Sequence, residues 1–253
     1  MDTENWPDSA ILFQPIESHQ SLLYEYADCL SVRAFLKMND LPFKLESRPN
    51  AEFMSPSGKV PFLKAGNEIV AEMEPIIEFV HKRGARLSDG LNDAELAEMQ
   101  AYMAMVRQVL LTAELYICWT HEPTLREVTK PRYGSVYAWP LSAVLPCMKQ
   151  SQIVSYLTSI GWREKTKNQV IEEVNECCKS LSVKLGDGPY FFGEKPTDVD
   201  ALVFGHLYTI LTTELPDVDL ASIVKRYANL VDFCQLIEKT YFMDRSLHGK
   251  RNR

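Results

Sequence analysis

A proline at the beginning of an apolar strand restricts the fold of this chain more than any other feature. Residues 58–63 read GKVPFL, and the side chains of Val60, Phe62 and Leu63 are typical of a buried strand. Proline has no N–H to donate, so it is excluded from the interior of a central strand. The sequence therefore predicts that Pro61 lies where a strand begins, beside a tight loop.

Short strand-like and helix-like segments alternate around this proline. We expect strands at 21–26, 43–47, 60–64 and 68–71, with helices at 29–39 and 74–82 and a loop at 48–59. The predicted order is β-α-β, loop, β-β-α. After a polar bridge at 84–92, the remaining periodic segments are helical.

Two helix beginnings in the second half carry clear capping signals. Asn92 precedes a long segment with apolar residues at alternating steps of three and four, and Glu95 can return a bond to its N–H. Thr197 and Asp200 form the same pattern before a helix that is apolar almost all round, which is typical of a helix at the centre of a domain. We expect residues 122–162 to be less regular and a last helix near 220–242.

These segments divide the chain into five parts. We predict an N-terminal extension (1–20), a domain of strands and helices (21–85) that a family resemblance given below implies to be thioredoxin-like, a linker (86–92), an all-helical domain (93–243) and a basic tail (244–253). The fold class is α+β, with helices predominating.

Composition excludes several functions. The net charge is −7 and no basic stripe with interleaved aromatic residues occurs, so we expect no nucleic-acid partner. The six cysteines form no C-x-x-C pair, and we expect neither disulfides nor a metal site. The longest apolar run, at 201–211, is about half of the roughly 20 residues that a membrane-spanning helix needs. We therefore expect no membrane-crossing segment and no secretory signal.

The order of segments, with Val60-Pro61 opening the third strand, resembles the glutathione transferase fold. In that fold the third strand begins with a cis proline. Further segments resemble the metaxin family, and among its members the form without a membrane anchor. They lie at 51–61, 132–135, 138–141, 189–192 and 200–208.

The metaxin resemblance implies a non-catalytic function. It implies a peripheral protein on the cytosolic face of the mitochondrial outer membrane, which serves the import and assembly of β-barrel proteins. It further implies docking through a membrane-anchored metaxin partner, no cofactor and no small-molecule substrate. Two alternatives remain open: an active glutathione transferase or a thiol enzyme that depends on Cys29, and a transferase-like scaffold module of a cytosolic complex.

The resemblance also implies where a glutathione site would lie. In catalytic members the backbone of the residue before the cis proline, here Val60 before Pro61, pairs with glutathione. An acidic residue and a serine follow the fourth strand there, and this sequence has Glu72 and Met73 at those positions. A thioether has no hydrogen to donate, so we interpret the site as degenerate.

The residue that activates the thiol in catalytic members has several candidates here. Cys29 could lie at a helix N-terminus, where the pKa of a thiol falls, but the proline that usually follows such a cysteine is replaced by Leu30. The other candidates are Tyr24, Tyr26 and Ser31.

Two further features have competing interpretations. The aromatic loop with Tyr133, Tyr137 and Trp139 is either a candidate interface or part of the filling of the helical domain. His206 lies on the apolar helix after Thr197, where we favour a hydrogen-bonded core histidine over a catalytic base.

Overall fold

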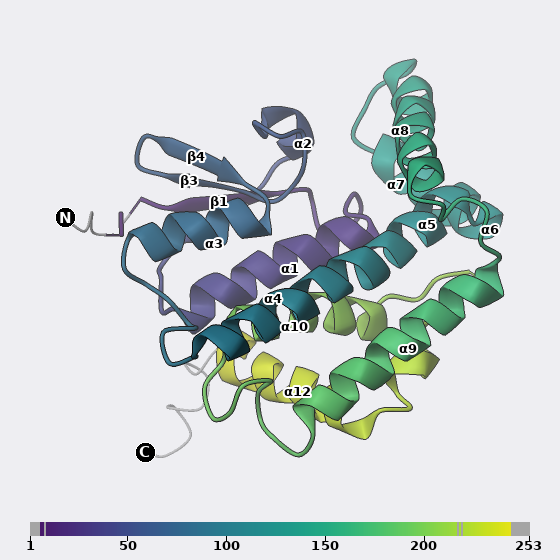
Figure 1. Cartoon of the computed structure of the whole chain (residues 1–253). Helices are drawn as coiled ribbons and strands as arrows, with labels where there is room; N and C mark the ends of the chain where they lie inside the picture. Colours follow the sequence, from purple (N-terminus) through teal and green to yellow (C-terminus); the bar gives the residue numbers. More distant parts are fainter. Residues whose placement is uncertain (1–5, 8, 217, 219, 244–253) are drawn as a thin grey trace, which may run out of the picture.

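The N-terminal part of the chain forms a four-stranded sheet with the strand order β2-β1-β3-β4. The computed structural model describes residues 6–7, 9–216, 218 and 220–243, and the predicted basic tail at 244–253 lies outside them (Figure 1). β1 pairs with β2 in parallel and with β3 antiparallel, and β3 pairs antiparallel with β4. The strands are β1 (Ile11–Gln14), β2 (Lys44–Ser47), β3 (Phe62–Ala65) and β4 (Glu68–Ala71).

The first strand differs from the prediction. The strand expected at 21–26 is wrong, because those residues lead into helix α1 (Leu23–Met38). The Leu22 N–H donates to the Glu25 carboxylate at 3.0 Å, which is the reciprocal bond of a capping box and marks the helix start. The true first strand lies within the segment that was expected to be an N-terminal extension. It is short and central in the sheet, so it shows an unbroken apolar run, Ile-Leu-Phe, instead of alternation.

Three helices belong to the sheet-containing part of the chain. α1 and α3 (Met73–Lys82) pack together below the sheet in the view of Figure 1, and the short α2 (Ala51–Met54) lies in the loop before β3. The predicted order of strands and helices is therefore confirmed, with the addition of α2.

The rest of the described chain is helical, apart from two isolated β-bridges. The stretch at 122–162, expected to be less regular, is mostly helical. The predicted last helix is interrupted at 225–227. The helices and π-helical turns are α4 (Asp93–Val106), η1 (Arg107–Leu111), α5 (Thr112–Thr120), α6 (Glu122–Thr124), η2 (Leu125–Thr129), α7 (Lys130–Gly134), α8 (Leu141–Ser159), α9 (Lys167–Leu185), α10 (Asp198–Thr212), α11 (Leu220–Val224), α12 (Ala228–Ile237) and η3 (Glu238–Phe242).

Both predicted capping boxes are present. The Asn92 side chain accepts from the N–H groups of Ala94 and Glu95 at 3.0 Å, and the Glu95 carboxylate accepts from the Asn92 N–H at 2.9 Å. The Asp200 carboxylate accepts from the Thr197 N–H at 2.7 Å and from the Phe191 N–H at 2.9 Å. Burial raises the pKa of Asp200 to about 6 despite these bonds.

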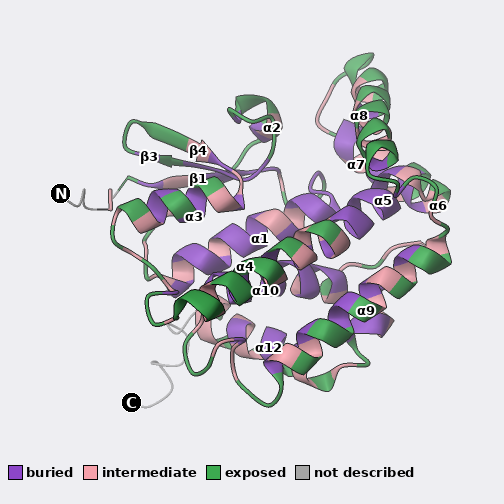
Figure 2. Ribbon diagram, in the orientation of Figure 1, coloured by how far each residue is buried: buried purple, intermediate pink, exposed green. Residues whose placement is uncertain are grey.

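The two halves are joined through the packing of α1 against α10. Both helices are mainly buried in Figure 2, as expected for helices that have apolar residues on several faces. Gly205 permits their close approach, because a Cβ atom there would lie 2.0 Å from the Ser31 Oγ and 2.5 Å from the Ala27 carbonyl oxygen. α10 therefore connects the sheet-containing part to the helical part.

Candidate functional site

The backbone at the beginning of β3 and of α3 forms one tight unit. The Val60–Pro61 peptide is cis, as predicted. The Glu72 N–H donates to the Pro61 carbonyl oxygen at 3.1 Å, and Glu72 has a φ of +71°, a conformation that is uncommon for residues other than glycine. The strand opening and the helix start are thus held side by side.

Met73 is the first residue of α3, and its side chain is only 2% exposed. It packs in the main hydrophobic core, so the position where catalytic transferases carry a hydroxyl holds a buried thioether. The neighbouring residues, Glu72 and Glu74, are acids and supply no hydroxyl either. The N-terminus of α3 therefore presents no side-chain hydroxyl to a ligand.

A cavity of about 350 Å³ opens beside this unit. Its walls come from α1, the loop before β3, the start of α3, η1, α5 and α8. The lining residues are Tyr24, Glu25, Asp28, Glu52, Ser57, Gly58, Lys59, Val60, Glu72, Met73, Arg107, Leu111, Leu115, Lys149, Gln152, Ile153 and Tyr156. The residues from η1, α5 and α8 were not predicted, because no local pattern connects them to residues 60–73.

The lysines of the cavity are paired with carboxylates. Lys59 Nζ lies 2.6 Å from a carboxylate oxygen of Glu72. Lys149 forms an ion pair with Glu52, and the Tyr133 hydroxyl donates to the same carboxylate at 2.8 Å. These contacts satisfy the lysines within the protein and connect α2 to α7 and α8.

Two further carboxyl groups face the cavity with altered acidity. Burial raises the pKa of Glu25 to about 7, although the Leu22 N–H donates to it and opposes the shift. Burial raises the pKa of Asp28 to about 6, against the attraction of His206 and Arg107. The cavity thus combines acidic groups with the cations Lys59, Arg107 and Lys149, and the raised pKa values bring Glu25 and Asp28 closer to their neutral forms.

The four candidate activating residues all lie within helix α1. The prediction that Cys29 lies at a helix N-terminus is wrong, because α1 begins at Leu23 and Cys29 is buried inside the helix. Burial raises the pKa of the Cys29 thiol well above its usual value, so the unreactive thiol form is favoured. Burial also raises the pKa of Tyr24, and that of Tyr26 to about 12, while the Ser31 hydroxyl donates to the Ala27 carbonyl oxygen at 2.8 Å.

His206 is a hydrogen-bonded core residue, as predicted. Its Nδ1 lies 2.9 Å and 3.1 Å from the two carboxylate oxygens of Glu114 on α5, and both side chains are fully buried. Its Nε2 lies 3.9 Å from Asp28 of α1. Burial alone would lower the pKa of His206, but the Glu114 carboxylate outweighs this effect and the pKa is raised. The three side chains connect α1, α5 and α10.

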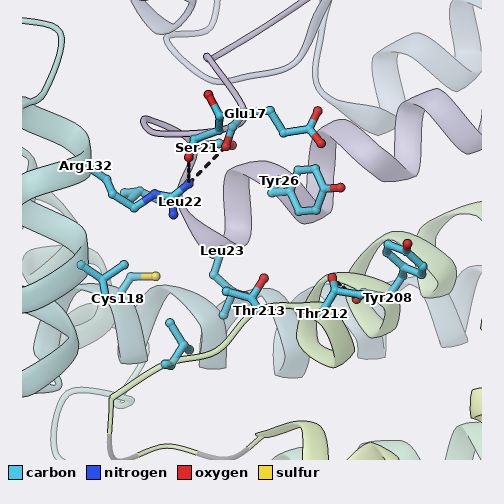
Figure 3. A pocket seen from close by; sticks show the side chains of 13 residues that line it. Glu17, Ser21, Leu22, Leu23, Tyr26, Cys118, Arg132, Tyr208, Thr212 and Thr213 are labelled. Atoms are coloured by element: carbon cyan, nitrogen blue, oxygen red, sulfur yellow. Dashed lines mark hydrogen bonds between the residues drawn. The ribbon is translucent and has the colours of Figure 1, made fainter.

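A second cavity, of about 360 Å³, involves other residues of α1 (Figure 3). Arg132 donates to the backbone carbonyl oxygens of Glu17 and Ser18 at its edge, so the guanidinium holds the loop before α1. Burial raises the pKa of the Cys118 thiol, which also lines this cavity, to about 12. No group in this cavity has the properties of a nucleophile.

The three aromatic side chains of the predicted interface differ in their exposure to solvent. Tyr133 is buried, and its ring packs edge-on against Trp119 with centroids 5.6 Å apart. Tyr137 is partly buried, and its ring lies 6.3 Å from that of Phe53. The Trp139 side chain is 84% exposed. Of the three residues in the predicted interface, Trp139 alone is largely open to solvent.

Within the part of the chain that the structure describes, no cluster of His, Cys, Asp and Glu side chains could hold a metal ion. Among the same residues, none of the helices combines the length and the apolar character that crossing a bilayer would require.

Comparison with known proteins defines the class of the chain first. Residues 27–125 match the model of the glutathione S-transferase N-terminal domain, and residues 174–237 match that of the C-terminal domain. The structure of glutathione S-transferase III in its apo form superposes with a TM-score of 0.58 at 13% identity, covering 97% of this chain and 98% of the other. The chain has the glutathione transferase fold.

Two relatives then define the family. Metaxin-2 of Homo sapiens is 52% identical over 96% of this chain and 92% of its own length. The metaxin-2 homolog of Caenorhabditis elegans is 43% identical over 83% of this chain and 90% of its own length. The chain belongs to the metaxin family.

Proposed function

We propose that the chain is a non-catalytic subunit of a complex at the mitochondrial outer membrane that imports and assembles β-barrel proteins. The observation that carries the loss of catalysis is the start of α3, where the buried Met73 occupies the hydroxyl position. Membership of the metaxin family carries the cellular role. A fold that has lost its ligand chemistry still offers a rigid surface for other proteins.

The proposed attachment is peripheral, on the cytosolic face of the membrane. A membrane-anchored metaxin is the proposed docking partner, and the β-barrel assembly complex is the larger assembly. Affinity purification from gently solubilised mitochondria should recover both. Recovery of cytosolic complexes alone would instead favour a general scaffold module.

The chain should not be retained on immobilised glutathione. The expected cause is the buried thioether of Met73 at the helix start, together with the pairing of Lys59 with Glu72 and of Lys149 with Glu52. A catalytic transferase passed over the same resin provides the positive control. Strong retention, or conjugating activity that Cys29→Ser abolishes, would contradict the absence of catalysis.

Depletion of the chain from cells should lower the amount of assembled outer-membrane β-barrel channels and of the anchored metaxin. Import into the matrix should be largely unaffected, because the proposed complex acts on outer-membrane substrates. Native gels of mitochondria, with radiolabelled channel precursor and matrix precursor compared side by side, measure both. Normal channel assembly in depleted cells that lack a redundant relative would refute the proposed function.

A further inference from the structure

Helix α8 carries large apolar side chains that no other part of the described chain covers. It stands at the edge of the molecule, packed mainly on α5 and α7, and most of its length is exposed (Figures 1 and 2). Leu141, Val144 and Met148 are 51%, 47% and 63% exposed, and Trp139 just before the helix is 84% exposed. A helix that faces only water normally has charged residues on its outer face.

The apolar character is confined to one end of this face. Positions 141, 144 and 148 follow helical spacing and lie on one side of α8. The next positions on the same side are Ser151 and Ser155, which are exposed and polar. Trp139, Leu141, Val144 and Met148, at the N-terminal end of α8, are called the α8 tip surface below. Tyr156 and Ile160 are also exposed but lie at the other end of the helix.

The segment that contains the α8 tip surface has no acidic residue. Residues 128–162 include Lys130, Arg132 and Lys149 but neither Asp nor Glu, although the whole chain has 34 acidic residues and a net charge of −7. Acidic residues of other elements lie near α8: Glu52 forms an ion pair with Lys149, and Glu25, Asp28 and Glu72 line the cavity that α8 borders. The segment itself therefore presents no carboxylate that would repel an anionic surface.

These features fit a lipid surface better than a protein partner. Tryptophan and large aliphatic side chains are the groups that occupy the interfacial region of bilayers. Lys130 lies on α7, which packs against α8, and adds a cationic group that favours anionic lipids. At the start of α8 the Ser142 N–H donates to the Ala138 carbonyl oxygen, and the Ala143 and Val144 N–H groups donate to that of Pro140, which reduces the cost of placing this end in a bilayer. Residues 128–162 contribute cationic but no acidic side chains, which suits a partner of one charge sign such as an anionic lipid surface.

We propose that the α8 tip surface inserts into the interfacial region of a membrane that contains anionic lipid. The contact places the chain on the bilayer directly, in addition to attachment through a protein partner. Only the side chains of this surface enter the bilayer, and the helix does not cross it. The contact depends on no partner protein and therefore does not rest on the proposed function.

The full chain should bind vesicles without any other protein present. Flotation with vesicles of equimolar phosphatidylcholine and phosphatidylserine should carry the wild-type chain, and pure phosphatidylcholine should carry less. The Trp139→Ser/Met148→Ser variant should lose at least about tenfold in partitioning, because each side chain gives up much of its burial energy. Cys147 is the exposed cysteine and the other five are buried, so a polarity-sensitive fluorophore there should shift to shorter wavelength on binding.

Val183→Ser is the matched control. Val183 lies on α9 and is 78% exposed, so it offers an equally open apolar side chain outside the α8 tip surface. This variant should float like the wild type, and thermal melts should show that all variants fold.

Three results would overturn the proposal. They are a wild-type chain that stays with the soluble fraction, a Trp139→Ser/Met148→Ser variant that floats unchanged, and equal binding to neutral vesicles, which would remove the anionic preference. A concentration-dependent dimer in analytical ultracentrifugation that the same variant abolishes would assign the surface to a second copy of the chain instead.

Discussion

Gly205→Ala should lower the free energy of unfolding by about 3 kcal/mol or more, a large part of the 5–15 kcal/mol that usually stabilises a protein. The added Cβ would lie 2.0 Å from the Ser31 Oγ, 2.5 Å from the Ala27 carbonyl oxygen and 2.6 Å from the Ser31 backbone nitrogen. Two of these atoms belong to the backbone of α1 and cannot rotate away. The helices must separate, and thermal melts monitored by circular dichroism will measure the loss.

Gly90→Ala serves as the matched control for this prediction. A Cβ at Gly90 meets no atom within 4 Å and its φ is not positive, so the change should stay within about 0.5 kcal/mol. Adding Ser31→Gly to Gly205→Ala should restore only part of the stability, because the backbone contacts persist. A Gly205→Ala protein that melts like the wild type would show that α1 and α10 are not so close.

His206→Leu should cost about 3–5 kcal/mol of stability at neutral pH, because it leaves the fully buried Glu114 carboxylate without its partner. The additional change Glu114→Leu should recover most of that loss, since replacing both members of a buried ion pair with apolar groups is often nearly neutral. Comparison of the two single variants with the double variant gives the coupling directly. A double variant whose loss of stability equals the sum of the two single losses would show that the pair contributes no coupling.

The pH dependence of this pair has a defined sign. The pKa of His206 is raised in the folded state by Glu114, and burial raises the pKa of Glu114 itself. The folded state therefore binds more protons at these sites than the unfolded state does. The stability from His206 is fully present below its ordinary pKa of 6.5 and is lost as the pH rises through the higher folded value. In the His206→Leu variant the unpaired Glu114 carboxylate takes up a proton as the pH falls, which removes the cost of its buried charge. The difference in stability between variant and wild type should therefore shrink in acid, although the wild-type contribution of His206 is fully present there.

Local signals made much of the fold predictable. Pro61 could be placed at the beginning of a strand because proline lacks an N–H. The helices after Asn92 and Thr197 could be predicted from capping residues three positions apart. The first strand was missed, because a short apolar run such as Ile11–Gln14 gives no periodicity that separates strand from helix. Leu22 to Tyr24 are also buried and apolar, and they led to the prediction of a strand at 21–26 instead.

The candidate site was only partly predictable. Residues 60–61 and 72–73 were predicted from the resemblance to transferases. That resemblance locates the backbone at the start of β3 and α3, but it does not predict the side chains that form the other walls of the cavity. The contact of Glu114 with His206 joins residues 92 positions apart, and no local pattern reports such a pairing. The exposure of Trp139 against the burial of Tyr133 depends on how α7 folds back, which composition does not encode.

The packing of α1 against α10 also has a consequence for synthesis on the ribosome. Ser31 of α1 bonds to the Leu202 carbonyl oxygen of α10, 171 residues later, so the emerging N-terminal half lacks its main apolar covering until translation is nearly complete. Contacts this distant along the chain delay folding, and apolar surface exposed in the meantime favours aggregation. We therefore expect α1 to keep apolar surface exposed until α10 has been synthesised, and a chain truncated before α10 to be unstable.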